Sequence, residues 1–214
     1  MIIPIEYGKS VLPETMVFEN GKKDVFHEIV FKVYLIKIDD KLILADAGCE
    51  TMPGFVMRDF IGTVKALEKI NIHPSDITDV LITHSHHDHI EAVKYFSNAV
   101  IHITASEYPS GKKYIPESFK VHIFEKEYAI YPGVRFVEWG GHSKGSVVVE
   151  VEAGDKIHLL AGDECYTQEN IAQKRCTGTF CNKEKATEFV EKYSAFQYCV
   201  HTCHDNALKT ERII

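Results

Sequence analysis

Apolar residues follow two different rhythms along the chain, and these predict where helices and strands lie. Over residues 55–71 they recur every three or four positions, as on one face of an amphipathic helix. The same rhythm returns over 184–196, and a shorter helix is expected around 91–96. The face of the 184–196 helix that we expect to be buried consists of Ala186, Phe189, Val190 and Tyr193.

Alternating or continuous apolar stretches rich in β-branched residues predict the strands. Val30–Ile38 and Lys41–Ala47 are expected to be neighbouring strands around a turn at Asp39 and Asp40. The remaining predicted strands span 79–83, 100–103, 121–124, 129–139, 147–151 and 156–160. Helices near both ends of the chain, with strands between them, fit two sheets covered by helices on their outer sides.

Length and composition predict one globular domain over residues 1–214, since 214 residues suffice for one substantial core and are few for two. A hydrophobic content of 45% and a charged content of 26% are ordinary. The net charge of −7 argues against a nucleic-acid partner, which requires a basic surface. The N-terminus lacks a signal-peptide pattern, no apolar stretch approaches membrane-spanning length, and the six cysteines suggest reduced thiols. We therefore expect a cytoplasmic protein without a membrane partner, while the oligomeric state is left open.

The most informative chemistry lies directly after the predicted strand 79–83. There the chain reads His84-Ser85-His86-His87-Asp88-His89, with four metal-capable side chains of interest at His84, His86, Asp88 and His89. An ordinary core does not place so many ionisable groups together, because burying them unpaired costs roughly several kcal/mol each. Imidazole and carboxylate ligands suit zinc, or iron, manganese or cobalt. A metal site is the simplest interpretation.

Three further strand ends place one candidate ligand each. His142 lies in the glycine-flanked turn after the strand ending near Trp139, and Asp163 follows the apolar stretch at Leu159 and Leu160. His204 ends a third apolar stretch. Loops at one edge of a scaffold commonly build a functional site in this way.

The order HxHxDH, His, Asp, His resembles the metallo-β-lactamase superfamily of binuclear metallohydrolases, over nearly the whole chain. The stretches ending in Asp46-Ala47-Gly48 and the loop Gly141–Ser146 resemble smaller motifs of that family. The resemblance implies an α/β protein with the αβ/βα four-layer sandwich. It implies a first metal held by His84, His86 and His142. It implies a second metal held by Asp88, His89 and His204, with Asp163 bridging both.

Such a site implies hydrolysis by a water that two divalent ions, Zn²⁺ first among the candidates, activate together. The attacked group would be the carbonyl of an ester, thioester, lactone or lactam in a small-molecule substrate. Asp88 is expected to take the proton from the attacking hydroxide and pass it to the leaving group. Asp46 is expected to orient a ligand rather than to bind metal itself.

The segment after Asp163 favours a lactone. Asp163-Glu164-Cys165-Tyr166-Thr167-Gln168-Glu169-Asn170 resembles the Asp-x-x-Tyr-Thr-x-Glu-Asn segment of N-acyl homoserine lactone lactonases, which implies a role in quorum quenching. In that group the tyrosine hydroxyl points at the substrate carbonyl, so Tyr166 would donate a hydrogen bond to the developing oxyanion. The chain departs from these lactonases at Glu91, which is either a partner of a ligand or the first-turn acid of a helix.

Two alternatives stay open. A thioesterase resembling glyoxalase II would share the ligands but needs basic residues for glutathione, for which Lys209 and Arg212 are the few candidates. A mononuclear iron oxidoreductase resembling persulfide dioxygenase would need only one metal, and the full second set of ligands argues against it. We therefore expect a binuclear zinc-dependent hydrolase that opens a lactone.

Overall fold

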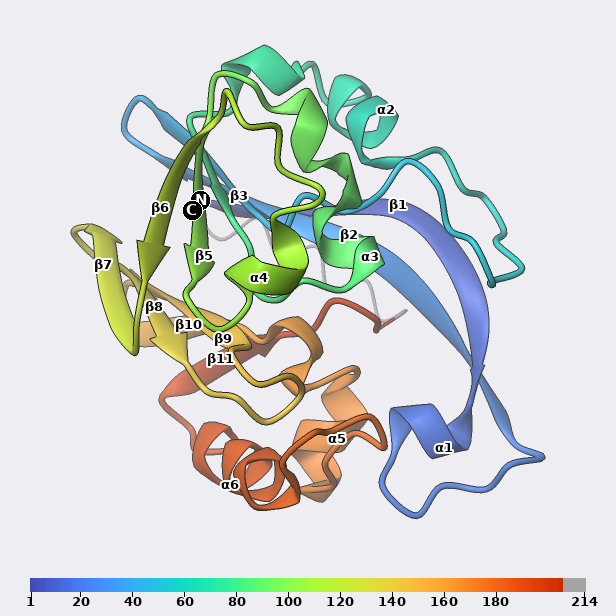
Figure 1. Cartoon of the computed structure of the whole chain (residues 1–214). Coiled ribbons are helices and arrows are strands. Elements are labelled where there is room, and N and C mark those ends of the chain that lie inside the picture. Colours follow the sequence, from blue (N-terminus) through green and yellow to red (C-terminus); the bar gives the residue numbers. More distant parts are fainter. Residues whose placement is uncertain (206–214) are drawn as a thin grey trace. The chain divides into compact units, whose positions relative to one another are not determined.

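The structure is a computed structural model that describes residues 1–205 and contains two mixed β-sheets with helices (Figure 1). It divides into two compact units, one formed by Met1–Ser10 and Val30–Phe124 and the other by Val11–Ile29 and residues 125–205. The single domain over 1–214 stays a prediction. Lys209 and Arg212 lie outside the described residues.

The first sheet has six strands in sequence order, and its central strands run parallel. These strands are β1 (Ile2–Pro13), β2 (Phe26–Ile38), β3 (Lys41–Ala45), β4 (Asp79–Leu81), β5 (Val100–Thr104) and β6 (Lys120–Phe124). The antiparallel hairpin β2–β3 turns at Asp39, whose φ of 48° lies in the left-handed region that aspartate tolerates. From β3 to β6 each strand is parallel to the next, so the carboxyl ends of β3, β4 and β5 lie at one edge of the sheet.

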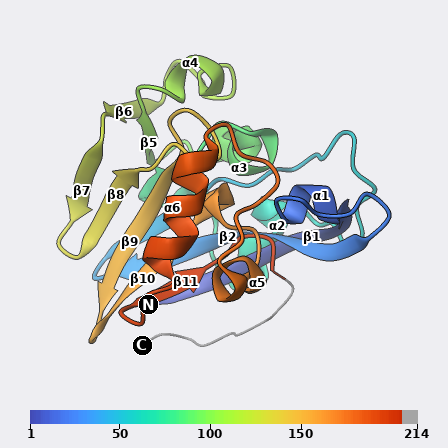
Figure 2. The ribbon, with the colours of Figure 1, turned by 90° about the horizontal axis from the view of Figure 1, so that it is seen from below.

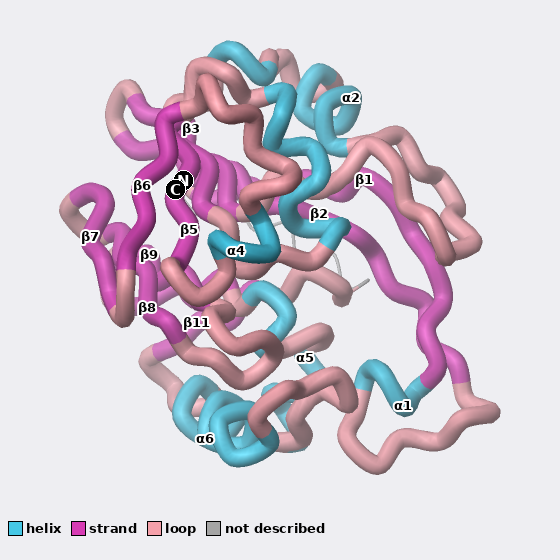
Figure 3. Tube along the Cα trace, in the orientation of Figure 1, coloured by secondary structure: helices cyan, strands magenta, loops and turns pink. Residues whose placement is uncertain are grey.

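Short helices connect the parallel strands, as parallel pairing requires a crossover. They are α2 (Thr63–Glu68), η1 (Pro74–Asp76), α3 (His87–Ile90), η2 (Glu91–Tyr95) and α4 (Tyr108–Gly111). The long segment between β3 and α2 is a loop (Figure 3). No helix within residues 1–205 is long and apolar enough to cross a membrane.

The second sheet has five strands in the order β11, β10, β9, β8, β7. They are β7 (Glu127–Tyr131), β8 (Val134–Glu138), β9 (Val147–Ala153), β10 (Lys156–Leu160) and β11 (Tyr198–His201). The strands from β7 to β10 are antiparallel, whereas β10 and β11 are parallel. The carboxyl ends of β8, β10 and β11 therefore lie at the same edge of this sheet.

Helix α6 (Lys183–Tyr193) covers one face of the second sheet (Figure 2). Its buried residues are Ala186, Phe189, Val190 and Tyr193, which confirms the predicted apolar face. Phe189, Val190 and Tyr193 pack in one core cluster with Leu159 of β10 and Val200 of β11. The same unit contains α1 (Glu14–Val17), η3 (Gly162–Glu164) and α5 (Gln168–Gln173).

Two predicted elements differ from the structure. The helix over 55–71 was wrong in its first half, because α2 begins at Thr63. Before it, Arg58 pairs with Lys9 through two backbone hydrogen bonds, and Gly62 has a φ of 77°, which a helix cannot contain. The predicted strand 129–139 is two strands, β7 and β8, because Pro132 and Gly133 form a turn between them. The long strand β1 at the start of the chain was not predicted.

Candidate metal centre

In the first unit, the carboxyl ends of two neighbouring parallel strands place the first polar residues of the site. β3 is followed by Asp46 and β4 by Thr83 and His84, and the pairing of Ala45 with Leu81 brings these ends together. Both Asp46 and His84 are buried, with exposed fractions of 4% and 0%. In open parallel sheets this edge is where ligands bind.

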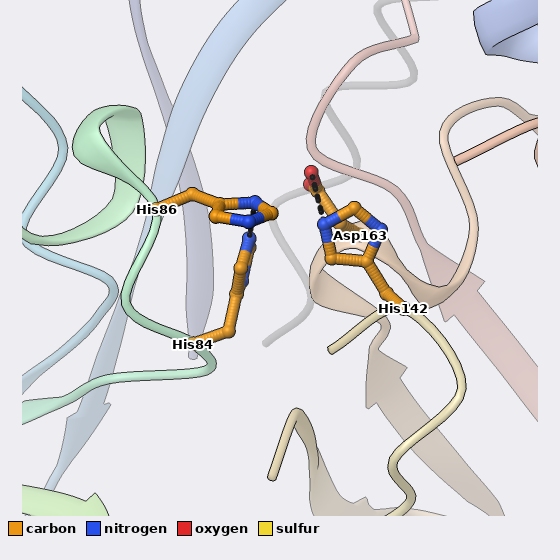
Figure 4. A group of neighbouring side chains, drawn as sticks. All are labelled: His84, His86, His142 and Asp163. Carbon is orange, nitrogen blue, oxygen red and sulfur yellow. Dashed lines mark hydrogen bonds and ion pairs between the residues drawn. The ribbon is translucent and has the colours of Figure 1, made fainter. Parts of the chain in front are cut away.

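His84 and His86 face each other beyond the end of β4 (Figure 4). Nε2 of His84 lies 3.0 Å from Nδ1 of His86, which is close to the separation of two nitrogens on one tetrahedral metal. Ser85, the residue between them, is fixed by Glu107, because its amide and its hydroxyl both donate to this buried carboxylate, at 2.9 and 2.6 Å. Glu107 thus holds the backbone that carries both imidazoles.

Asp46 acts on a histidine of the same motif, as expected. Its Oδ2 lies 2.8 Å from Nδ1 of His89, while Thr83 donates to the carboxylate through its amide at 2.7 Å and its hydroxyl at 2.9 Å. A carboxylate at Nδ1 stabilises the tautomer with a proton on that nitrogen and leaves Nε2 with the lone pair that a metal requires.

Asp88 and His89 lie in the single turn of α3, where Oδ2 of Asp88 is 3.5 Å from Nε2 of His89. The Tyr7 hydroxyl of β1 donates to the carbonyl of Asp88 at 2.8 Å, and this fixes the turn. His87 points elsewhere, since its Nε2 lies 2.8 Å from the carbonyl of Thr51, which agrees with its exclusion from the ligand set.

The open question about Glu91 has a structural answer. Its carboxylate accepts the amide of Glu50 at 2.8 Å and pairs with Lys94. Although burial raises the pKa of Glu91, the bonds from Lys94 and from the Glu50 amide hold it below its usual range. Glu91 therefore fastens the loop after Gly48 to η2.

In the second unit, three strand ends at one edge of the sheet place three candidate ligands. His142 follows β8, Asp163 follows β10 within η3, and His204 follows β11. All three are buried, with exposed fractions of 7%, 4% and 3%. Because β10 and β11 run parallel, the residues after their carboxyl ends lie beside each other.

The two carboxylate oxygens of Asp163 face two different histidines. Oδ2 lies 3.4 Å from Nε2 of His142, and Oδ1 lies 3.1 Å from Nε2 of His204. Figure 4 draws the His142–Asp163 pair with its ion pair dashed. A carboxylate in this position can offer one oxygen to each of two metal ions, and each ion would have a histidine beside it. This donor set fits two divalent ions.

The loop that carries His142 is built around Glu164, a buried carboxylate that the sequence pattern does not single out. Its Oε1 accepts the amides of Gly141 and His142, at 3.0 and 3.1 Å, and the hydroxyl of Ser146. A Cβ on Gly141 would lie 2.3 Å from Oε2 of Glu164, so only glycine permits this approach. Burial raises the pKa of Glu164 to about 7, against the lowering effect of these three hydrogen bonds.

Tyr166 and His142 are joined through Thr179, which lies between α5 and α6. The carbonyl of Thr179 is 2.6 Å from Nδ1 of His142, and its hydroxyl donates to the Tyr166 oxygen at 2.9 Å. The Tyr166 ring also meets the His204 ring edge-on, with centroids 4.8 Å apart. A phenol oxygen can accept one hydrogen bond, here from Thr179, and donate another through its O–H.

The predicted residues thus fall into two groups. His84, His86, Asp88 and His89 gather in the first unit, and the second unit gathers His142, Asp163, Tyr166 and His204. Sequence reasoning missed Glu107, Glu164 and Thr179, whose partners lie 13 to 37 residues away in sequence. No local spacing signals such contacts.

Three comparisons with known proteins add to this geometry. A family model described as the metallo-beta-lactamase superfamily matches residues 32–196. An N-acyl homoserine lactonase of Bacillus cereus is 28% identical over an alignment of 165 residues, with a coverage of 64% of this chain. The matched part spans 65% of that relative, somewhat less than two thirds of its length.

Solved structures match over more of the chain. A quorum-quenching N-acyl homoserine lactone hydrolase superposes with a TM-score of 0.83 at 20% identity, covering 98% of this chain and 93% of that one. A dizinc quorum-quenching lactonase in complex with a product gives 0.77 at 19% identity, covering 97% and 88%. At these identities the likeness shows the fold alone. It confirms the predicted α/β class and the αβ/βα sandwich of the metallo-β-lactamase fold.

Proposed function

We propose, because this chain belongs to the metallo-β-lactamase superfamily, that it is a metal-dependent hydrolase that opens a lactone. The observation that carries the proposal is the placement of Asp163, whose two oxygens face His142 and His204 separately. A carboxylate that offers one oxygen to each of two ions would be turned toward two imidazoles in this way. The proposed ligands of two divalent ions, Zn²⁺ first among them, are His84, His86, Asp88, His89, His142, Asp163 and His204.

The chemistry that two bound divalent ions supply is a water of lowered pKa and a polarised carbonyl oxygen. The residues of the chain itself would transfer protons during the reaction and orient the histidine ligands. Asp88, a carboxylate with an exposed side-chain fraction of 15%, is proposed to accept a proton from the attacking water and deliver it to the leaving alkoxide. Asp46 and the Thr179 carbonyl set the Nδ1 tautomers of His89 and His142, which keeps each Nε2 basic.

Tyr166 is proposed to donate a hydrogen bond to the oxyanion that forms at the attacked carbonyl. Its hydroxyl is held by Thr179, and its ring is held against His204, so the phenol is preorganised at the proposed ligands. The substrate that we propose is a small molecule, an N-acyl homoserine lactone. This choice is supported by the similarity of the chain, in sequence and in fold, to proteins described as lactonases.

A biological role follows from the substrate. We propose quorum quenching in the cytoplasm, without a nucleic-acid partner, because the net charge of −7 opposes binding to a phosphate backbone.

The first experiment is hydrolysis by zinc-loaded protein of short- and long-chain N-acyl homoserine lactones, beside S-lactoylglutathione and a chromogenic lactam. We expect chelator-sensitive opening of the lactones alone. Activity on the thioester alone would move the chain to the glyoxalase II-like class. If none of the three substrate classes is hydrolysed, the proposed substrate is wrong.

The role of Tyr166 has its own test. Tyr166→Phe should keep its bound metal and lower turnover ~10- to 1000-fold, the scale of one oxyanion donor. Tyr95→Phe, at a tyrosine that is 45% exposed and outside the proposed site, is the matched control and should keep full turnover. Full activity in Tyr166→Phe would remove the main reason to prefer a lactone substrate.

A further inference from the structure

A cluster of two histidines and a cysteine lies on the parallel strand pair β10–β11, outside the proposed catalytic set. In the register of this pair, His158 stands opposite Cys199, and Leu160 stands opposite His201. Side chains two apart on a strand share a face, so His158, Cys199 and His201 all project from the same face of the sheet. The register and the alternation of two strands therefore create this cluster.

The opposite face of the same two strands is apolar and packs in the core. Leu159 of β10 and Val200 of β11 point there and pack in the core beneath α6. The face with the two histidines and the thiol is thus separate from that apolar core. A polar cluster there needs its own explanation, because nothing in the α6 packing requires it.

The potential ligand atoms of the three residues lie close together. One atom from each lies within 4.8 Å of the others, and Nδ1 of His158 is 3.0 Å from Nε2 of His201. On a tetrahedral zinc ion, bond lengths of about 2.0–2.1 Å to nitrogen and 2.3 Å to sulfur place neighbouring ligand atoms roughly 3.3–3.7 Å apart. Small rotations of the side chains would satisfy this geometry.

Burial and charge also suit a metal. His158 is buried, while Cys199 and His201 are half-buried, so an ion can enter from solvent. Burial, with a smaller effect from Lys156, lowers the pKa of His158 and favours the neutral imidazole that coordinates metals.

We propose that His158, Cys199 and His201 form a second, independent binding site for a thiophilic divalent ion of the zinc class. Nδ1 of His158, Sγ of Cys199 and Nε2 of His201 are the ligand atoms, and water fills the fourth position. The Cys199 thiol releases its proton to solvent when its sulfur binds the ion. The site lies beyond the proposed lactone chemistry and uses none of its residues.

Cobalt(II) is the probe that tests this site, because a thiolate bound to cobalt gives a near-ultraviolet charge-transfer band, whereas His and Asp ligands do not. Metal-depleted protein, kept reduced by a phosphine, is titrated with Co²⁺. We expect the band in the wild type, its loss in Cys199→Ala, and about one equivalent less bound cobalt in that variant. His158→Gln should weaken the cobalt affinity of the band at least 10-fold while thermal unfolding shows a folded protein.

Two cysteines serve as matched controls. Cys203, whose Sγ lies 3.4 Å from Asp163, and the exposed Cys181 should both keep the band when changed to alanine. A wild type without the band, a band that survives in Cys199→Ala, or equal cobalt contents in both proteins would overturn the proposal. Because spectrum and stoichiometry need no substrate, this test stands even if lactone hydrolysis is never observed.

Discussion

Thr179 connects two parts of the proposed centre with a single residue. Its carbonyl holds His142 and its hydroxyl holds Tyr166, so side chain and backbone can be separated by mutation. Thr179→Val removes only the hydroxyl bond, which is worth about 0.5–1.5 kcal/mol and corresponds to ~2- to 10-fold in turnover. We expect that loss with unchanged metal content, measured by steady-state kinetics and metal analysis.

The control for Thr179→Val is a substitution by the other small hydroxyl residue, serine. Thr179→Ser keeps the hydroxyl and should restore most of the turnover. If valine and serine behave alike, the hydroxyl bond to Tyr166 has no functional weight.

Glu164 predicts a pH effect of defined sign in metal-depleted protein. Its pKa is raised from 4.5 to about 7 in the folded state, so between these values the folded protein retains a proton that the unfolded chain has released. Stability therefore falls as pH rises through this window, by at most about 1.4 kcal/mol for each pH step of one between the two pKa values. Glu164→Gln, which stays neutral, should gain stability relative to the wild type between pH 5 and pH 8.

Urea unfolding of both metal-depleted proteins at the two pH values measures this effect. The comparison between wild type and variant removes the contribution of the histidines, which titrate in both. An unchanged difference in stability between pH 5 and pH 8 would show that Glu164 does not hold its proton in the folded state.

At the scale of elements, α6 illustrates what local pattern can predict. Phe189 is fully buried and packs against Trp139 and Tyr193, as the helical spacing indicates. Phe189→Ala should destabilise the protein by roughly 3–5 kcal/mol, through lost transfer energy and the cavity left behind. Glu188→Ala, at an exposed position of the same helix, should change stability by less than about 0.5 kcal/mol. Urea midpoints measure both, and similar losses would contradict the packing.

Elements that depend on distant partners are not predictable in this way. The residues before α2 have helical spacing, yet Arg58 pairs with Lys9 of β1, and Glu50 occupies the space beside Gly62. Tertiary contacts therefore override the periodicity there. A motif reveals the proposed ligands, whereas the contacts of Glu107 with Ser85 and of Glu164 with the His142 loop form only in the folded chain.

At the scale of the whole molecule, metal removal should lower stability. His142, Asp163 and His204 follow three different strands, and His204 lies 41 residues after Asp163, so the unfolded chain cannot present them together. An ion that binds only the folded state stabilises it by about 2.7 kcal/mol at 100 times its Kd. We expect chelation to lower the thermal midpoint of the wild type by several degrees.

Asp163→Ala is the matched variant for this effect. Its midpoint should be nearly insensitive to chelator, apart from any ion held at Cys199. Equal sensitivity in both proteins would mean that the stabilising metal binds elsewhere.

The parallel pairing of β10 with β11 also affects the order in which the second sheet forms and metal binds during refolding. Parallel strands need a crossover, and here the connection from β10 to β11 contains η3, α5 and α6. The entropy lost in closing this long connection opposes strand pairing until the strand contacts form, so non-local pairing is slow. The antiparallel strands from β7 to β10 need no such step. During refolding, we expect the antiparallel strands from β7 to β10 to form before metal binds, because His204 follows β11 and is positioned only when β11 pairs with β10.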